Sequence, residues 1–548
     1  MRWFFILLLL ARPVLGDALV VSQSEFASQA GAGVMAEGGN AVDAAVATAF
    51  ALAVTHPTAG NIGGGGFLVF RSAGGETAAY DFRETAPAAA NPSMFLRDGK
   101  YDSTLHHNSH LAVGVPGTVA GLHLAWTNHG KLPWPRLVAP AIRLARDGFP
   151  VSKELAASLR AVLPSMKPYP AALSQFSKAG QPYAAGDLLR QPDLARTLQR
   201  IADQGPAGFY EGETALLIEQ EMLAHQGLIR RDDLKKYRAV RRDVIRGTYR
   251  DYEILSMPPP SSGGIALVEM LNILEGFNLR TNSPAQVIHL MAESMRRAFA
   301  DRALSLGDPD FNPDVPVKKL ISKEYAASLR RSIHLDHASK SSPDKFSWAP
   351  ESDQTTHLSV VDANQNAVAL TYTLEQGYGS KIVVPGAGFL LNNEMGDFNA
   401  APGLTTVDGL IGTAPNLAHP GQRMLSSMSP TIVIKNGRLF MVTGSPGGRT
   451  IINTVLETIV NAIDFEMDAQ KIVDAPRFHH QWLPDEIKIE SPGFSPEVVA
   501  ALASRGHIIR TGPRQGVAEV ILVRGQSLEA GIDLRDPDSA AARPQPLR

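Results

Sequence analysis

Residues 353–374 read DQTTHLSVVDANQNAVALTYTL, and the interpretation of the whole chain begins at this stretch. Two runs of alternating residues, Leu358 to Val361 and Ala367 to Leu374, flank the polar segment Asp362 to Asn366. Alternation on both sides of a polar turn is typical of a β-hairpin. Thr355 and Thr356 lie at the entrance to the first strand. Because β-branched residues favour strands, this pair taken alone indicates only where a strand begins.

The composition is that of an ordinary globular protein. The chain has 548 residues, of which 44% are hydrophobic and 19% charged, and its formal net charge is −2. This near-neutral balance gives no indication of a nucleic acid or an anionic membrane as partner. The chain contains no cysteine, which excludes disulfides, thiolate metal sites and a cysteine nucleophile. Length alone suggests three or four domains of about 150 residues.

The N-terminus is typical of a secretory signal peptide, which we expect to cover residues 1–16. Arg2 supplies a positive charge, residues 3–10 are apolar, and Val14-Leu15-Gly16 resembles a cleavage site. The apolar run is too short to span a bilayer as a mature helix. A buried N-terminal strand is the alternative, and it fits Arg2 and Pro13 less well. We therefore expect an exported protein without a membrane anchor, in the bacterial periplasm, with secretion to the medium as the second choice.

The remaining chain alternates predicted helices and strands. Apolar periodicity and capping residues predict the helices, and Asn-Gly between two apolar runs is a strong hairpin signal. Strand pairs followed by long helices favour a layered α+β architecture. A polar, proline-containing linker is expected just before the hairpin that Thr355 opens. The predicted segments are helices at 40–57, 284–302 and 451–463, a glycine turn and strand at 60–70, a hairpin at 431–443 and the linker at 337–351.

Several common catalytic motifs are missing from the sequence. It has no Gly-x-Ser-x-Gly elbow, no Walker A loop and no Gly-x-Gly-x-x-Gly between a strand and a helix. Four consecutive glycines, Gly63 to Gly66, indicate a close backbone approach more than a phosphate site. The pairs His106-His107 and His479-His480 lack the spacing of metal ligands, because adjacent residues of a strand face opposite ways.

A threonine mechanism is the remaining candidate. A threonine hydroxyl is a weak nucleophile that needs a base beside it. Cleavage between Gln354 and Thr355 would free an α-amine on the same residue, and its unperturbed pKa of roughly 7.7–8.0 suits proton transfer. The same hydroxyl could make that cut by attacking the preceding carbonyl and forming an ester that water resolves. From the threonine pair alone, a plain strand start is favoured over a nucleophile.

Ten sequence blocks, in family order, resemble the bacterial γ-glutamyltranspeptidases (γ-glutamyltransferases), which are N-terminal nucleophile hydrolases. Each block alone is a weak signal, but the ordered set is highly specific. The blocks are AVDAAVATAFALAVTHP, GGGGF, DFRETAP, AVGVPGTVAGL, PPPSSGG, TTHLSVVD, GFLLNNEMGDF, LSSMSPTIV, GSPGGRTIINTV and APRFHHQWLPDE. The resemblance implies a four-layer αββα sandwich built by two subunits of one precursor. It divides the chain into a large subunit, 17–354, and a small subunit, 355–548, that form one intertwined unit.

The resemblance also assigns roles to the residues of the catalytic centre. Thr355 matches the nucleophile that the substrate's γ-carbonyl acylates, and Thr373 matches a residue whose hydroxyl steadies it. Gly447 and Gly448 match the oxyanion hole, where backbone N–H groups meet developing charge. Without the resemblance, Thr373 is an ordinary hairpin residue and the glycines mark a tight turn.

Further residues match the substrate pocket of the family. Arg83 matches the arginine that holds the substrate α-carboxylate, which a guanidinium group can bind bidentately. Ser426 and Ser427 match a serine pair that helps to hold the same carboxylate. Read alone, Arg83 is a surface charge flanked by acids, and the serines are turn residues.

The expected α-ammonium pocket departs from the enteric pattern. Where those members have an Asn and a Gln beside an Asp, the matching positions here are Glu375, Glu394 and Asp397. Three carboxylates satisfy the three donors of an ammonium group but repel one another in an empty site. We therefore predict that at least one of them has a raised pKa in the free enzyme because of like-charge repulsion.

A second departure concerns the loop between Asp397 and Ser426, which in some members folds over the substrate with a tyrosine. The matching position here is Asp408. A polar side chain should exclude water less well, so we expect a greater share of hydrolysis relative to transfer.

The expected reaction is ping-pong acyl transfer. Thr355 would take the γ-glutamyl group from glutathione or a related compound and pass it to water, an amino acid or a peptide. No metal or organic cofactor is required for this reaction. One alternative is a β-lactam (glutaryl-type) acylase on the same fold, although Arg83 and the acids favour an α-amino acid substrate. A second alternative is an exported solute-binding protein without catalysis.

Overall fold

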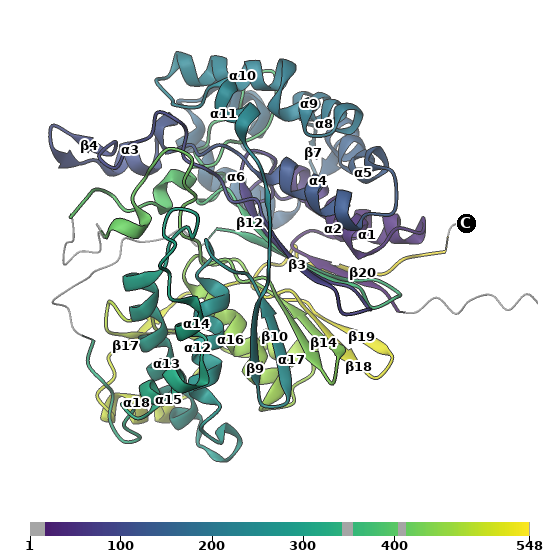
Figure 1. The fold of residues 1–548 in the computed structure, drawn as a ribbon. Helices are drawn as coiled ribbons and strands as arrows, with labels where there is room; N and C mark the ends of the chain where they lie inside the picture. Colours follow the sequence, from purple (N-terminus) through teal and green to yellow (C-terminus); the bar gives the residue numbers. More distant parts are fainter. Residues whose placement is uncertain (1–16, 342–353, 404–412, 547–548) are drawn as a thin grey trace, which may run out of the picture.

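The computed structural model describes residues 17–341, 354–403 and 413–546. The predicted signal peptide, most of the predicted linker and Asp408 lie outside the described residues. Helices and strands are both abundant, so the predicted mixture of helix and sheet is confirmed (Figure 1).

Two large antiparallel sheets form the centre of the molecule. The seven-stranded sheet has the order β20 (Ala540–Ala542), β1 (Leu19–Ser22), β11 (Thr356–Val361), β12 (Ala367–Thr373), β2 (Gly65–Arg71), β3 (Thr77–Asp81) and β8 (Val240–Arg242). The six-stranded sheet has the order β19 (Ser527–Gly531), β18 (Val520–Arg524), β14 (Arg438–Thr443), β13 (Thr431–Lys435), β10 (Tyr252–Ser256) and β9 (Ile245–Tyr249). Strands β11 and β12 contact β14, so the two sheets meet at the centre of the chain's fold.

Helices pack on both sheets (Figure 1). Helix α2 packs on β11 and β12, and α12 and α17 pack on the six-stranded sheet. The helices on the first sheet's side include α1 (Glu25–Ala36), α2 (Ala41–Thr55), α4 (Thr118–His129), α5 (Trp134–Asp147), α8 (Pro192–Gln204) and α10 (Gly212–Ala224). Those on the second sheet's side include α12 (Gly263–Leu274), α13 (Pro284–Ser305), α15 (Lys323–Arg330), α16 (Thr450–Ile463) and α17 (Ala469–Asp474).

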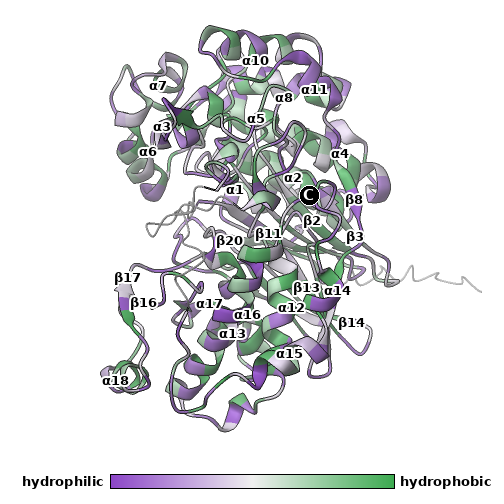
Figure 2. Cartoon of the chain, turned by 60° about the vertical axis from the view of Figure 1, so that its left-hand side comes forward, coloured by the Kyte–Doolittle hydropathy of each residue, from purple (hydrophilic) through white to green (hydrophobic). Residues whose placement is uncertain are grey.

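The predicted helices and hairpins are confirmed with small shifts at their ends. Asn40 caps α2 by accepting from the backbone N–H of Val42 and Asp43, and Ser283 caps α13 ahead of Pro284. The hairpin of β13 and β14 turns at Asn436-Gly437 as predicted. Burial follows the sequence closely: hydrophobic residues dominate α12, whereas the short surface helix α11 (Arg231–Lys236) is hydrophilic (Figure 2).

The central hairpin is buried on both faces, and its two faces serve different cores. Leu358, Val360, Leu370 and Tyr372 belong to the core that includes α2. Side chains alternate along a strand, so Thr355 and Thr373 lie on the other face, toward the second sheet. The fold therefore places the two predicted catalytic threonines between the sheets.

The glycine run beside this hairpin marks a close backbone approach, as predicted. A Cβ atom on Gly63 would lie 2.1 Å from the carbonyl oxygen of Leu390, and one on Gly64 would lie 2.1 Å from that of Thr373. On Gly66 it would lie 2.4 Å from the carbonyl oxygen of Thr371. Only glycine lets β2 pass this close to the end of β12.

Among the described residues, no helix combines the length and apolar character needed to cross a lipid bilayer.

We expect Gly66→Ala to lower the free energy of unfolding by about 1–3 kcal/mol or more, because its methyl group would push β2 away from β12. Gly74→Ala is the matched control, since the nearest atom to its new Cβ would be 3.7 Å away. Thermal and urea unfolding of both variants would measure the difference. Equal stabilities would contradict the proposed close packing of β2.

Candidate active site

Thr355 and Thr373 form the centre of the candidate site. The Thr355 hydroxyl donates to Thr373 Oγ1 over 3.4 Å, and the Thr373 hydroxyl donates to the carbonyl oxygen of Gln354 over 2.8 Å. Both threonine side chains are buried, at 6% and 3% exposure. A hydroxyl therefore lies at each end of the peptide bond that joins Gln354 to Thr355.

Glu375, two residues beyond the end of β12, helps to hold the Thr373 hydroxyl in place. The backbone N–H of Glu375 donates to Thr373 Oγ1 over 2.9 Å. Glu375 has a φ of 78°, in the left-handed region that residues other than glycine seldom adopt. Such conformations are concentrated at functional sites, where the surrounding structure enforces them. Here it directs a backbone donor at the Thr373 oxygen.

Arg83 is completely buried rather than on the surface, where its sequence neighbours alone would put it. It follows β3, and its guanidinium group donates to Glu394 and to Asp397. Its Nε donates to the carbonyl oxygen of Met424, and one of its terminal nitrogens donates to that of Leu425, each over 3.3 Å. Glu394 and Asp397 belong to the short helix η3 (Glu394–Asp397). Arg83 thus links the end of β3 to η3 and to the segment that contains Met424 and Leu425.

The buried charges shift one another's protonation. Burial is the main cause that raises the pKa of Glu394 well above its usual value, and the charges of Glu84, Asp397 and Glu375 raise it further while Arg83 lowers it. The predicted direction is found, but the predicted cause was incomplete, because burial raises the pKa of Glu394 more than the repulsion between like charges does. Burial likewise raises the pKa of Glu84 to about 8, against the opposing effect of Arg83.

The serine pair is held by a loop and by a second buried arginine. Ser262 donates from both its backbone N–H and its hydroxyl to the carbonyl oxygen of Ser426, over 2.8 and 2.6 Å. Arg302, on α13, donates to Ser427 Oγ over 3.0 Å and to Ser262 Oγ over 2.8 Å. The PPPSSGG and LSSMSP blocks are therefore neighbours that stabilise one another.

The two glycines of the expected oxyanion hole lie where α16 begins. Gly447 has a φ of 132° and Gly448 one of 54°, so both adopt conformations that favour glycine. A Cβ atom on Gly447 would also lie 2.4 Å from Thr450 Oγ1. The N-terminus of a helix carries partial positive charge, which suits a developing oxyanion.

One small pocket brings most of the predicted residues together. Gly447 and Gln354 do not line it, although each adjoins a residue that does. Thr355 also lines a larger cavity of about 750 Å³, together with Gln354, Arg449 and Lys488. The residues lining the small pocket are Arg83, Thr355, Thr373, Glu375, Glu394, Asp397, Ser426, Ser427, Met428, Gly448 and Ile451.

Three residues around this pocket were not predicted from the sequence. Glu84 has no exposed surface and lies 3.7 Å from an Arg83 nitrogen. His107 Nδ1 lies 3.7 Å from Glu375 Oε1. Arg302 supports the serine pair, and its only sequence signal is a cation near the end of helix α13. Their roles depend on contacts between distant segments, which periodicity does not reveal.

Comparison with known proteins agrees with this geometry. The family profile described as gamma-glutamyltranspeptidase matches residues 27–543. A glutathione hydrolase proenzyme of Escherichia coli strain K12 is 49% identical over 518 residues, which cover 92% of this chain and 88% of that protein. A glutathione hydrolase proenzyme of Pseudomonas aeruginosa is 42% identical over 534 residues, covering 95% of this chain and 94% of that protein.

Solved structures show the same relationship. A cephalosporin acylase from Bacillus halodurans superposes with a TM-score of 0.83 at 27% identity, covering 96% of each chain. The gamma-glutamyltranspeptidase of Helicobacter pylori superposes with a TM-score of 0.58 at 43% identity, covering 60% of this chain and 94% of that one. The fold and its neighbours define an N-terminal nucleophile hydrolase. Within that class, the chain belongs to the gamma-glutamyltranspeptidase family.

The buried Glu84 carboxyl predicts a specific pH dependence of stability. Because its pKa is raised from 4.5 to about 8 in the folded state, the folded state holds a proton that the unfolded state releases within that window. Stability from this group is therefore present below pH 4.5 and is lost as pH rises toward 8. We expect Glu84→Gln, which cannot ionise, to gain stability relative to the original protein by about 2 °C or more in Tm across this range.

Tm measured at half-unit intervals from pH 5 to about 8.5 would test this expectation. Glu211→Gln, at an exposed glutamate, is the control and should follow the original protein throughout. A constant difference between Glu84→Gln and the original protein over this range would contradict a raised pKa at Glu84.

Proposed function

We propose that this protein catalyses γ-glutamyl acyl transfer through a γ-glutamyl ester on Thr355. The donor is glutathione or a related γ-glutamyl compound, and the acceptor is water, an amino acid or a peptide. The observation that carries the proposal is the shared pocket, in which a threonine hydroxyl adjoins a buried arginine and several carboxylates. The relatives named glutathione hydrolase proenzyme support the same donor.

Maturation is proposed to begin at the bond between Gln354 and Thr355. The Thr373 hydroxyl, at 2.8 Å from the Gln354 carbonyl oxygen, can stabilise negative charge on that oxygen as Thr355 Oγ1 attacks its carbon. The peptide C–N bond then breaks, the proton from the hydroxyl passes to the departing nitrogen, and an ester forms. Water hydrolyses this ester and leaves a free α-amine on Thr355, which becomes the base for later turnovers.

Substrate recognition is proposed to use the charges around Arg83. The α-carboxylate of a γ-glutamyl donor would bind Arg83 with help from Ser426 and Ser427. Its α-ammonium group would bind among Glu375, Glu394 and Asp397. Because the α-carbon of the γ-glutamyl group carries one ammonium and one carboxylate, this end of the substrate can exchange partners with the buried ion pairs without adding net charge to the site.

Acyl transfer then follows in two steps. Thr355 Oγ1 attacks the γ-carbonyl carbon, the amine leaves with a proton, and the backbone N–H groups of Gly447 and Gly448 stabilise the oxyanion. Water or an acceptor amine attacks the ester and regenerates the hydroxyl. Each step uses the chain's own groups and requires no metal or organic cofactor. The expected effect of Asp408 on hydrolysis stays a prediction, because that residue lies outside the described part of the chain.

The proposed assembly is a four-layer αββα sandwich formed by a large subunit, 17–354, and a small subunit, 355–548, of one precursor. The two sheets and the helices packed on them support this arrangement. We further propose that residues 1–16 direct export to the bacterial periplasm. The supporting observation is the charge and apolar pattern of that segment.

The acylase alternative draws support from the similarity to a cephalosporin acylase. The pocket favours a different acyl group, because Arg83 with Glu394 and Asp397 matches both charges of an α-amino acid. A glutaryl group would leave the ammonium-binding acids without their partner. A non-catalytic binding protein would not require a threonine hydroxyl beside a scissile peptide bond.

We expect Thr355→Ala to remain a single uncut chain and to lose γ-glutamyl transfer, because the nucleophile for both reactions is removed. Denaturing electrophoresis and N-terminal sequencing of the smaller fragment would locate the cut, and release of the amine from a γ-glutamyl anilide would measure activity. Thr355→Ser is the control and should still be cut. An uncut original protein, or full activity of Thr355→Ala, would refute the proposal.

We expect Thr373→Val to slow the cut by about 10²-fold, the usual cost of losing one oxyanion donor. Thr356→Val is a matched control at the neighbouring residue, since the buried Thr356 hydroxyl has no hydrogen-bond partner among the described groups. A time course of fragment formation during refolding would compare the variants. Equal slowing in both would mean that any threonine substitution in this strand disturbs folding, and would contradict the role given to Thr373.

A further inference from the structure

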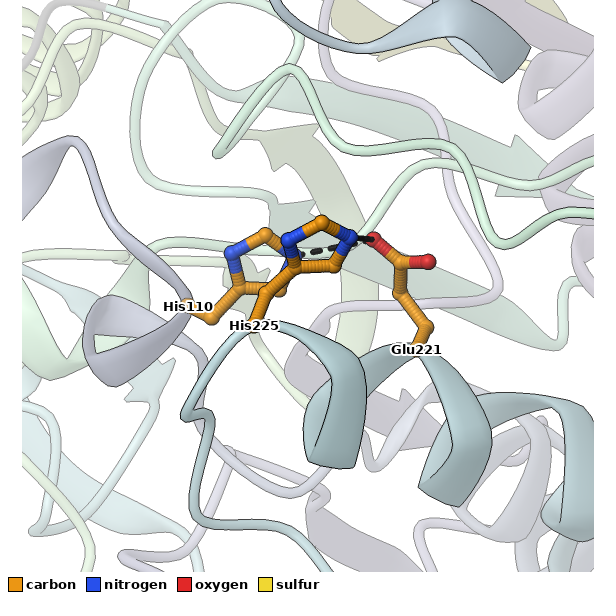
Figure 3. A group of neighbouring side chains, drawn as sticks. All are labelled: His110, Glu221 and His225. Carbon is orange, nitrogen blue, oxygen red and sulfur yellow. Dashed lines mark hydrogen bonds and ion pairs between the residues drawn. The ribbon is translucent and has the colours of Figure 1, made fainter.

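The side chains of His110, Glu221 and His225 lie close together (Figure 3), and none of them lines the pockets that contain Thr355. His110 Nε2 forms a hydrogen bond with Glu221 Oε1 over 2.9 Å, which a bound ion would replace, and His225 Nε2 lies 3.6 Å from the same oxygen. The two imidazole rings are stacked, with centroids 4.6 Å apart and planes inclined by 18°. All three ligand atoms lie within 4.8 Å of one another.

We propose that His110, Glu221 and His225 form a binding site for a divalent transition-metal ion, with Zn²⁺ as the first choice. The site is separate from the proposed acyl transfer, and no step of that reaction depends on it. Two imidazoles and one carboxylate are a common ligand set for zinc and for other first-row dications. The fourth position would be open to water.

The distances agree with this coordination. Zinc bonds of about 2.0–2.2 Å to nitrogen and oxygen in a tetrahedron place neighbouring ligand atoms roughly 3.3 Å apart. The two nitrogen-to-oxygen distances, 2.9 and 3.6 Å, lie on either side of that value. Because stacked rings direct their nitrogen lone pairs side by side, the His225 ring would also have to turn out of its stack with His110 to face the same ion. His225 is free to make this adjustment because its side chain is 54% exposed.

The local fold fixes the other two ligands. Glu221 and His225 are four residues apart at the end of α10, so they lie on the same side of the helix. The C-terminal end of a helix carries partial negative charge, which favours a bound cation. His110 begins the short helix η1 (His110–Ala112), and its side chain is 8% exposed. Two largely buried ligands and one exposed ligand suit capture of an ion from solvent.

A second group of similar composition does not fit a metal as well. His289 Nδ1 and His507 Nε2 bond directly to each other over 2.8 Å, and all three members are buried. The nearby Glu293 already pairs with Arg296 and Arg297. A cation there would have to break the bond between the histidines and approach two guanidinium groups, so the hydrogen bond and ion pairs account for this group without a metal.

A metal at the first site would join two segments of the large half of the chain. The segment that leads to His110 contains α3 (Ser103–His107), whose last carbonyl oxygen accepts from the side chain of Asn393 over 3.0 Å. Asn393 directly precedes Glu394 of the candidate site. The ion would therefore fasten α10 to a segment that supports the pocket wall, which gives it a stabilising role.

The test is calorimetric titration of the untagged, full-length protein with Zn²⁺, repeated with Co²⁺ to record its visible ligand-field absorption. The original protein should bind one ion at this site. His225→Ala and Glu221→Gln should each weaken that binding by about tenfold or more, since even an outer-shell loss costs 10–100-fold. His419→Ala, at an exposed histidine elsewhere, should leave it unchanged.

These binding measurements test the proposed metal site without any measurement of catalysis. Weaker binding in both cluster variants, with the Co²⁺ absorption lost and an unchanged Tm in the absence of metal, would support the site. Equal Zn²⁺ affinity in the original protein and His225→Ala, or no saturable binding in the original protein, would overturn it. Because His225 is largely exposed, its substitution should not disturb folding.

Discussion

The register between β11 and β12 is the constraint on which the candidate site depends. Thr356 pairs with Tyr372, so Thr355 lies at the end of its strand beside Thr373. A shift of one residue would turn Thr373 toward α2 and separate the two hydroxyls. The turn itself resists such a shift: Asp362 accepts from the backbone N–H of Asn364 and Asn366, and its other oxygen accepts from Ala41 at the start of α2. Helix, turn and nucleophile are therefore positioned together.

A second constraint is electrostatic. Burying Arg83 costs free energy that only close partners can offset, and the partners are acids that are themselves buried. Removing either side would leave an uncompensated charge, so the arginine and the acids of η3 must be retained or lost together. The same arrangement explains why the pocket suits a molecule with one ammonium and one carboxylate group. Such a molecule replaces both partners at once, whereas a singly charged acyl group satisfies only one.

Local patterns in the sequence predicted much of this fold. The central hairpin, the helices at α2, α13 and α16, and the turn at Asn436-Gly437 each follow from periodicity, caps or turn residues close in sequence. The glycine run was correctly predicted to mark a close backbone approach, but the sequence did not reveal which strand lies against it. The resemblance to a family named the pocket residues, and the structure brings most of them together.

Other features could not be predicted because they arise only when distant segments meet. Arg83 sits between two acids in the sequence and has the pattern of a surface charge, yet loops more than 300 residues away enclose it. Neither Arg302 nor Glu84 has a sequence signal that indicates which residues it contacts. The predicted cause of the raised pKa of Glu394, repulsion between like charges, was incomplete for the same reason, since the extent of burial is a property of the assembled loops.

Both sheets contain strands from before and after Thr355, and this determines whether a cut at that residue would separate the two halves of the chain. Strands β1, β2, β3 and β8 precede the junction, whereas β11, β12 and β20 of the same sheet follow it. The other sheet likewise combines β9 and β10 from before the junction with strands from after it. Separating the halves would expose ladder hydrogen bonds along β1–β11, β2–β12 and β10–β13, together with both buried cores. A single broken peptide bond removes none of these interactions, so the sheets can hold the pocket together while the new terminus at Thr355 becomes available for chemistry.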